Sequence, residues 1–472
     1  MLLYRYRKIE NALKEIENGT FYLAPSNELN DPLESFLQVY WQGDIQAWEG
    51  LLRNYIYSLY IALKCYYSKG DIFDPIVQRF LIKHNFIYYK IDVELYKKLG
   101  DAFFQNSFVK RVLEYCVNLN SGNRISKAEL TVLLTFTHEI ALKICANILT
   151  KINYISEKDK IHSFLKNCDQ NLTSHFEKLL ETIKCIGDNN ISIQNKEIIK
   201  RVFFSSAKDG LTDVIEQNYC LSFSSSPAED NQQINWISVH CDFPRNYVDI
   251  LTEMIYPNSY VACFSKCNDN SSMWGNYADN HKGVCLIYEG GKNNILNLHS
   301  DNLNFDLNLP IKPILYEGEH IERNFFNSLG LFTYDQIKLW LTGTDGSLSH
   351  IYDEYTGQNR EKWEKSYLED CDNKDFKKLK EWSNEEEYRI AFSDRYNQLF
   401  ACKNINQRCF KFNYSSLKGI IFGIRTTYKD KKQIISLLSK HKNEIDDFKF
   451  FQSEYDELNK KIFIREKFWK LK

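Results

Sequence analysis

The sequence predicts an α+β protein in which a long all-helical segment is inserted into a β-containing core. Helical periodicity dominates from 42 to about 205, whereas strand-like runs lie on either side of that segment. These runs are at 2–7, 21–24, 261–265, 283–288, 388–392 and 419–423. We therefore divide the chain into an N-terminal part of the core at 1–41, a helical insertion at 42–205 and the remainder of the core at 206–472.

The first part of the core opens with the strand at 2–7. Ile9, Leu13 and Ile16 recur at helical spacing, and Gly19 follows where a helix commonly ends. A second strand at 21–24 leads into a turn-rich loop at 25–32. The predicted order is strand, helix, strand and loop.

The insertion reads as a bundle of helices. Ser126 and Glu129 have the spacing of a capping box, and an apolar stripe follows from Leu130 to Ile148. Another helix is expected to begin near Ser156. The segment therefore predicts several packed helices.

The last part of the core is predicted to be mixed. A polar loop is expected at 222–233 and a helix at about 245–256. The stretch at 292–313 is rich in Asn, Asp and Leu and reads as a loop. A helix at 428–441 and a lysine-rich tail complete the prediction.

Composition limits the class of protein. Lys plus Arg is 60 and Asp plus Glu is 62, so the net charge of -2 argues against a protein that coats nucleic acid through bulk charge. The 13 cysteines are odd in number and dispersed, which argues against a disulfide framework. Cys263 and Cys267 have no second pair at zinc-like spacing.

We find neither a signal peptide nor roughly 20 consecutive apolar residues, so we expect a cytoplasmic protein that does not enter a membrane.

The first candidate cluster lies on the N-terminal strand. Alternation places Tyr4 and Tyr6 on one face and Arg5 and Arg7 on the other. Two arginines on one face suit a phosphate or a carboxylate, although they equally suit a solvated strand face.

The second and third clusters are loops beside strands. Asn30 and Asp31 precede Pro32, which marks a turn or a positioning loop.

In the third cluster, Ser265 ends a strand. Trp274 and Tyr277 are three residues apart, so on a helix they share one face. That face either stacks on a planar ligand or fills the core.

The fourth cluster precedes a strand near the C-terminus. If that strand begins early, Glu385, Glu387 and Arg389 lie on one face. A Glu-x-Glu pair at the mouth of a strand suits acid–base chemistry or a cation-like transition state, but three glutamates also suit a solvated turn.

Taken in order, the motifs resemble those of the bacterial family of domain-of-unknown-function 2971 proteins. They are Tyr-x-Tyr-Arg, Asn-Asp-Pro, Cys-Phe-Ser, Met-Trp-x-x-Tyr-Ala-x-x-His-x-Gly and Trp-x-x-Glu-x-Glu-x-Arg. The resemblance covers about 2–36, 260–290 and 378–425, and the helical insertion lies outside it. The family description implies no activity.

A more distant resemblance is to ADP-ribosyltransferases, which share a split β-sheet core and three signature elements in the same chain order. The elements are a strand with an aromatic residue before Arg or His, a strand with an aromatic residue before Ser, and a Glu-x-Glu or Gln-x-Glu. In this sequence they would be Tyr6-Arg7 or Tyr4-Arg5, Phe264-Ser265, and Glu385-x-Glu387. The resemblance implies that NAD is the substrate, that Arg7 or Arg5 binds its pyrophosphate, and that Tyr277 or Trp274 stacks on nicotinamide. It implies that Glu387 stabilises the oxocarbenium-like centre and that Glu385 orients the acceptor. The predicted NAD-binding residues are Tyr4, Arg5, Tyr6, Arg7, Asn30, Asp31, Ser265, Trp274, Tyr277 and Arg389.

Three other functions remain open. A serine hydrolase would pair Ser265 with His281. A metal-dependent nuclease would place Asp31, Glu34, Glu385 and Glu387 around Mg²⁺. A non-enzymatic sensor would bind a protein partner through the helical insertion.

If the chain is instead an active transferase, it would modify a protein or a nucleic acid, or hydrolyse NAD. It would then act as a toxin or an antiviral effector.

Overall fold

The computed structural model divides into two compact units. The sheet unit contains Met1–Leu37, Pro257–Ile321 and Leu368–Lys472, and the helical unit contains Gln38–Tyr256 and Glu322–Tyr367. The mixed α+β class is confirmed. The structure describes residues 1–31, 37–68, 93–117, 124–156, 158, 160–167, 172–188, 192–221, 227–301, 305–316, 321–394 and 408–471.

A large, mostly antiparallel sheet forms the centre of the sheet unit, with nine strands among the described residues. In order across the sheet, the strands are β10 (Lys312–Pro313), β14 (Glu387–Asp394), β6 (Asn258–Ser265), β1 (Leu2–Arg7), β7 (Val284–Glu289), β16 (Leu417–Phe422), β17 (Lys449–Asp456) and β18 (Lys461–Lys467), and β3 (Ala24–Pro25) also pairs with β6. Five of the predicted runs appear as β1, β6, β7, β14 and β16, because each alternates in a way that buries one or both faces.

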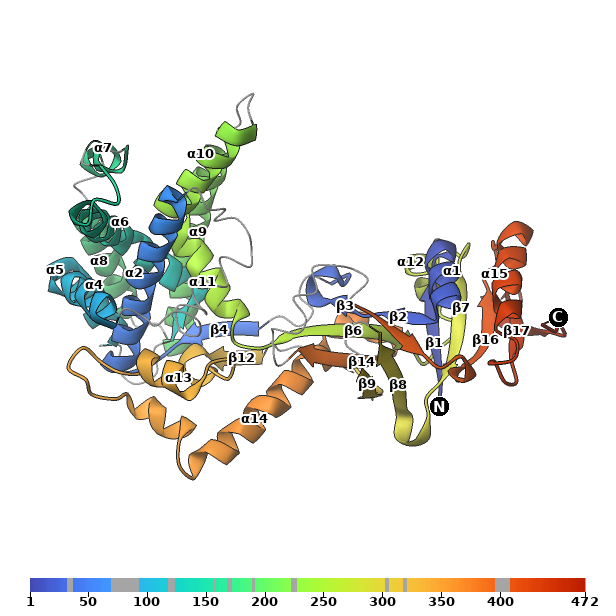
Figure 1. Cartoon of the computed structure of the whole chain (residues 1–472). Helices are drawn as coiled ribbons and strands as arrows, with labels where there is room; N and C mark the ends of the chain where they lie inside the picture. Colours follow the sequence, from blue (N-terminus) through green and yellow to red (C-terminus); the bar gives the residue numbers. More distant parts are fainter. Residues whose placement is uncertain are drawn as a thin grey trace. The chain divides into compact units, whose positions relative to one another are not determined.

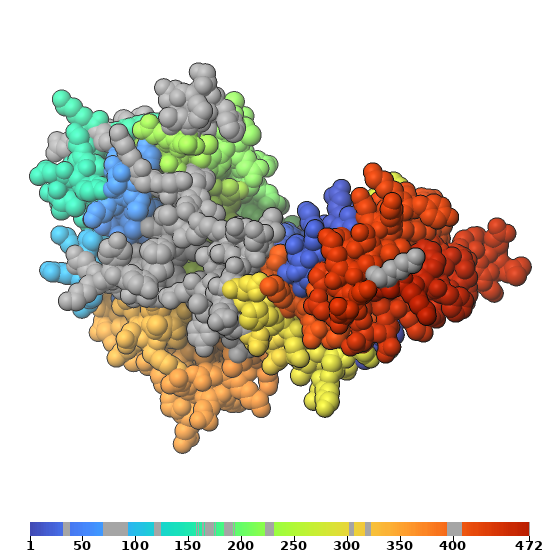
Figure 2. Space-filling model, turned by 45° about the vertical axis from the view of Figure 1, so that its right-hand side comes forward, coloured from blue at the N-terminus to red at the C-terminus, as the bar shows by residue number. Residues whose placement is uncertain are grey.

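Two smaller sheets complete the unit. One has the order β2 (Thr20–Tyr22), β15 (Cys409–Phe412), β8 (Ile295–Ser300) and β9 (Phe305–Pro310), and the other pairs β11 (Leu315–Tyr316) with β13 (Lys377–Lys378). The helices α1 (Ile9–Asn18) and α15 (Tyr428–Lys440) pack against each other. N-terminal residues, in blue, therefore lie against C-terminal residues, in red, on the surface of this unit (Figure 2).

The sequence analysis missed two pairs of strands in this unit. The stretch predicted as a loop at 292–313 contains the β8–β9 hairpin, in which Leu296, Leu298 and Leu309 are buried. The lysine-rich tail, for which no element was predicted, contains β17 and β18, and they pair from Phe450 to Asp456 and from Lys461 to Lys467. In both cases polar residues on the exposed face hid the alternation that marks a strand.

The helical unit is a bundle, as the sequence predicts (Figure 1). Its main helices are α2 (Ile45–Tyr67), α4 (Val93–Gln105), α5 (Ser107–Val117), α6 (Lys127–Lys151), α7 (Lys160–Asn167), α8 (Leu172–Asp188), α9 (Ile193–Leu221), α10 (Pro227–His240), α11 (Phe243–Glu253) and α13 (Tyr334–Trp340). The predicted capping box is present, because the Ser126 side chain accepts from the Glu129 amide and Glu129 accepts from the Ser126 amide.

The helical unit extends beyond the predicted insertion. Residue 205, the expected boundary, lies inside α9, and α10 begins within the stretch expected to be a polar loop at 222–233. Residues 322–367 also belong to this unit, and they contribute β12 (Ile321–Asn324), which joins β4 (Leu37–Trp41) and β5 (Ile125–Ser126) in a small sheet. Contacts distant in sequence set the boundary, so local periodicity could not locate it.

The helix α6 is the central helix of the bundle. Of the helices in the described ranges, it alone is long and apolar enough to cross a membrane, and 56% of its most apolar stretch is buried within the protein. It packs against α2, α9 and α11. Its apolar character is therefore accounted for by packing inside the bundle.

Candidate functional site

Three of the predicted motifs meet on neighbouring strands. In the central sheet, Ser265 on β6 lies directly opposite Tyr4 on β1 and directly opposite Glu387 on β14. Side chains that lie directly opposite one another in a sheet project from the same face. The strands thus place residues from both ends of the chain in one row, which we call the Tyr4–Ser265–Glu387 row.

The two faces of β1 have different surroundings, as its alternation predicts. Tyr6 lies on the face of the row, where its ring meets Trp274 edge-on at 5.1 Å between centroids. Arg5 lies on the opposite face, with its guanidinium 5.1 Å from the ring centroid of Phe264. The predicted arginine pair is therefore on the other side of the sheet from Glu387.

The arginine pair binds a carboxylate of the protein itself. The Nε atoms of Arg7 and Arg5 lie 2.9 Å and 3.3 Å from Oε2 of Glu15, and the Tyr288 hydroxyl donates to its Oε1 at 2.8 Å. Burial raises the pKa of Glu15, while Arg7 opposes the rise. Glu15 comes from α1, and the sequence analysis missed it as the partner of the arginines.

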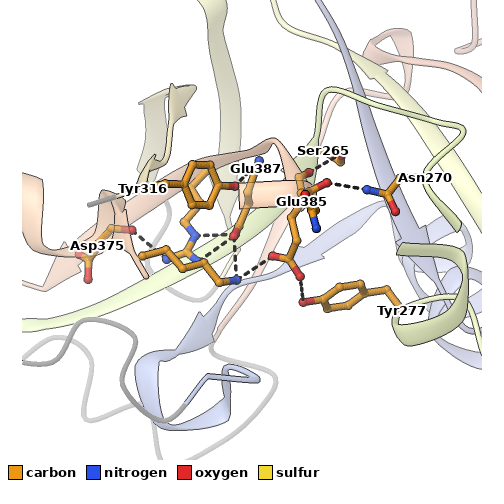
Figure 3. Close-up of polar contacts among 10 residues, drawn as sticks. Ser265, Asn270, Tyr277, Tyr316, Asp375, Glu385 and Glu387 are labelled. Atoms are coloured by element: carbon orange, nitrogen blue, oxygen red, sulfur yellow. Dashed lines mark hydrogen bonds and ion pairs between the residues drawn. The ribbon is translucent and has the colours of Figure 1, made fainter. Parts of the chain in front are cut away.

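The two predicted catalytic carboxylates form the centre of a buried ion-pair cluster (Figure 3). The Lys378 ammonium lies 2.7 Å from Oε2 of Glu385 and 3.1 Å from Oε2 of Glu387. Arg389 donates to both oxygens of Glu387, at 2.6 Å from Nε and 3.0 Å from Nη2. The Tyr277 hydroxyl donates to Oε1 of Glu385 at 2.7 Å. We call these five residues the carboxylate cluster.

Burial and charge oppose each other in the carboxylate cluster. Burial raises the pKa of Glu387, and the ammonium of Lys378 opposes this rise. Burial lowers the pKa of Lys378, but Glu387 and Glu385 outweigh that effect and hold it above its ordinary value. Burial lowers the pKa of Arg389 to about 9, so the guanidinium still carries its charge at neutral pH. Each charge in the cluster depends on its partners.

The Glu-x-Glu turn is held in place by its neighbours. Glu386 has a φ of 41°, a left-handed conformation that turns the chain between the two glutamates. Ser265 donates from Oγ to the carbonyl of Glu385 at 2.8 Å, and Asn270 donates to the carbonyl of Asn384 at 2.5 Å. Because the Ser265 hydroxyl donates its hydrogen bond to this carbonyl oxygen, Ser265 stabilises the turn in this structure.

The Met-Trp motif lies on α12 (Ser271–Asn276) and on the loop that follows it. Trp274 is fully buried, donates from Nε1 to the carbonyl of Asn268 at 2.9 Å, and stacks on His281. A Cβ at Gly283 would lie 2.2 Å from the carbonyl oxygen of Arg7. These residues pack the loop against β1, and Tyr277 is the one whose polar atom reaches the carboxylates.

The Asn-Asp-Pro motif contributes through one residue. Asp31 is buried, and its charge partly offsets the lowering of the pKa of Arg389 by burial. Asn30 is exposed. Pro32 and Glu34 lie outside the described residues. Within the described part of the chain, no three His, Cys, Asp or Glu side chains are grouped so that they could hold a metal ion.

The sequence analysis missed Lys378 as the cation shared by both glutamates. It also missed Tyr316, whose hydroxyl accepts from the Glu387 amide at 2.8 Å. Both residues come from the small β11–β13 sheet, where Tyr316 lies opposite Lys378. No spacing in the sequence indicates this pairing, because a short parallel pair leaves no local pattern.

Fold and site together define an α+β protein with two buried glutamates, paired with cations, at the start of strand β14 in the central sheet. Residues 273–390 match the family model described as a protein of unknown function, DUF2971. The resemblance predicted from the motifs is therefore confirmed for this segment, which contains Tyr277, Lys378, Glu385, Glu387 and Arg389.

One curated relative is the flagellar hook-length control protein of Buchnera aphidicola subsp. Schizaphis graminum. It is 31% identical over 123 residues, which is 24% of this chain and 32% of the relative. The chain thus spans about a third of the relative's length. No solved structure matches the chain.

Proposed function

We propose that the carboxylate cluster is the reaction centre of an NAD-consuming enzyme, either an ADP-ribosyltransferase or an NAD hydrolase. The Tyr4–Ser265–Glu387 row carries the proposal, because it places the three elements of the distant resemblance on adjacent strands. Loss of nicotinamide develops positive charge on the ribose. A carboxylate such as Glu387 stabilises that charge, and Glu385 orients the attacking nucleophile.

The cluster also indicates which face NAD would use. Glu385, Glu387 and the Tyr277 hydroxyl lie together, whereas Arg5 and Arg7 are held by Glu15 on the opposite face. The proposal therefore places the nucleotide on the side of Tyr277 and gives Arg5 and Arg7 a structural part. The acceptor would be a protein, a nucleic acid or water.

The direct test is nicotinamide release from NAD by the full-length protein, with and without cell lysate as a source of acceptor. We expect Glu387→Gln to lower the rate by about 100-fold or more, because it removes the charge that stabilises the transition state. Glu386→Gln is the matched control, since this neighbouring side chain is exposed, and it should leave the rate nearly unchanged.

Two outcomes would contradict the proposal. One is equal loss of activity in both variants. The other is no release by the wild-type protein under any condition, together with no NAD binding in calorimetry.

A second candidate is a non-enzymatic, partner-binding protein. It is favoured by the hydrogen bonding of the carboxylates, since both oxygens of Glu385 and both of Glu387 already accept from a protein donor. Such clusters also occur as structural ion pairs. In this case the helical unit would bind the partner, and NAD would not be consumed.

If the enzyme is active, NAD loss or target modification would harm the cell that makes it. A role as a controlled toxin or an antiviral effector follows, with the helical unit as the sensor or the restraint. Expression of the wild-type chain should slow growth and lower cellular NAD, and Glu387→Gln should abolish both effects. Growth inhibition that persists in Glu387→Gln would contradict this role.

A further inference from the structure

We infer that Lys378 is a positioning residue that keeps Glu385 and Glu387 ionised and correctly oriented in the carboxylate cluster. The inference rests on the proposed function for its catalytic consequence. Its electrostatic part stands on the geometry alone. Neither the motifs nor the family match assigns a role to this lysine.

Lys378 contacts both carboxylates through one nitrogen. Its Nζ donates to Glu385 at 2.7 Å and to Glu387 at 3.1 Å, and all three side chains are buried. Arg389 contacts Glu387 in addition. The ammonium therefore links the two glutamates and fixes their separation.

Two carboxylates that share a single nitrogen as hydrogen-bond donor are close enough to repel each other strongly. Arg389 compensates only one of the two negative charges, so without Lys378 the pair of carboxylates takes up a proton more readily. A protonated Glu387 has no charge with which to stabilise a developing cation. The reaction therefore requires a fixed positive charge at the position of Lys378.

The backbone fixes that position. Lys378 lies on β13, opposite Tyr316 on β11, and the Tyr316 hydroxyl accepts from the Glu387 amide at 2.8 Å. The Lys378 ammonium also lies 4.8 Å from the ring centroid of Trp382. The small sheet thus places the lysine and the backbone of the Glu-x-Glu turn with respect to each other.

The first test is the pH profile of nicotinamide release by Lys378→Met and Lys378→Arg. Removing the ammonium should move the acid limb of the profile of Lys378→Met upward by about one to three pH units. Lys378→Arg should restore most of the profile, because it returns a cation. An unshifted profile in Lys378→Met would overturn the inference.

The second test needs no activity and measures thermal unfolding between pH 5 and pH 8. Burial raises the pKa of Glu387 in the folded protein, so stability falls as pH rises from the ordinary glutamate pKa of 4.5 to the raised value in the folded state, which is the window of this group. Without Lys378 the window should extend upward. The deficit in melting temperature of Lys378→Met relative to wild type should therefore grow with pH.

The matched control is Lys374→Met. Lys374 is a buried lysine four positions away that donates to Ser259 and Asp375, at 2.6 Å and 3.1 Å, and contacts neither glutamate of the cluster. Adding Glu387→Gln should remove most of the pH-dependent deficit in Lys378→Met and none of the deficit in Lys374→Met. A deficit in Lys378→Met that does not change with pH would overturn the inference.

The two tests separate the inference from the proposed function. If the wild-type protein releases no nicotinamide, the proposed function fails. The unfolding experiment then decides alone whether Lys378 keeps the glutamates ionised. If release occurs and only the pH profile fails to shift, the proposed function survives and the role of Lys378 is overturned.

Discussion

Replacing Arg389 with Met should destabilise the sheet unit by about 3–5 kcal/mol, the usual cost of removing one partner of a buried ion pair. Arg389 is fully buried on β14, donates to both oxygens of Glu387, and donates from Nη1 to the carbonyl of Asp375 at 2.9 Å. Its removal leaves a buried carboxylate and a buried carbonyl oxygen short of donors. The effect should appear in denaturant unfolding of the full-length protein.

A double variant tests whether the loss comes from the ion pair. Arg389→Met combined with Glu387→Met should recover part of the stability, since Lys378 still pairs with Glu385 and only the buried Asp31 loses a nearby cation. Arg465→Met is a control in the same sheet, because Arg465 pairs with Glu454 in an exposed position. It should leave the unfolding midpoint nearly unchanged. A double variant less stable than Arg389→Met alone would contradict this account.

Local patterns predicted those parts of the fold whose energetics are local. The strand at 2–7 matches β1, and the helix closed by Gly19 matches α1, in which Gly19 has a φ of 62°. The capping box at Ser126 predicted the start of α6. Alternation, a left-handed cap and a side-chain cap each act within a few residues, so the sequence shows them directly.

The sequence predicted only part of the site, because alternation within one strand is a local pattern and the pairing of distant strands is not. Alternation separated Tyr4 and Tyr6 from Arg5 and Arg7, but it could not show which face would meet Glu387. The pairing of β1 with β6 and of β6 with β14 decides that question, over separations of more than a hundred residues. Lys378 reaches the cluster from another sheet, and the motif that begins at Trp382 does not include it.

Among the described glycines of the helical unit, Gly50 is the position where a methyl group should have the largest effect. On α2, a Cβ at Gly50 would lie 1.7 Å from the carbonyl oxygen of Trp340, in the last turn of α13. That atom is backbone, so it cannot move without shifting the helix. Gly50→Ala should therefore destabilise the unit by about 1–3 kcal/mol, even though alanine favours a helix over glycine.

Gly210→Ala is the matched control for Gly50→Ala. Gly210 is exposed on α9, and a Cβ there would meet nothing within 4 Å. This change should stabilise the unit by about 0.5–1 kcal/mol, the helix preference of alanine. Hydrogen exchange should become faster in α2 and α13 of Gly50→Ala and should not in Gly210→Ala. If Gly50→Ala leaves exchange in α13 unchanged, the close approach of α13 to α2 at Gly50 is not what holds these helices together.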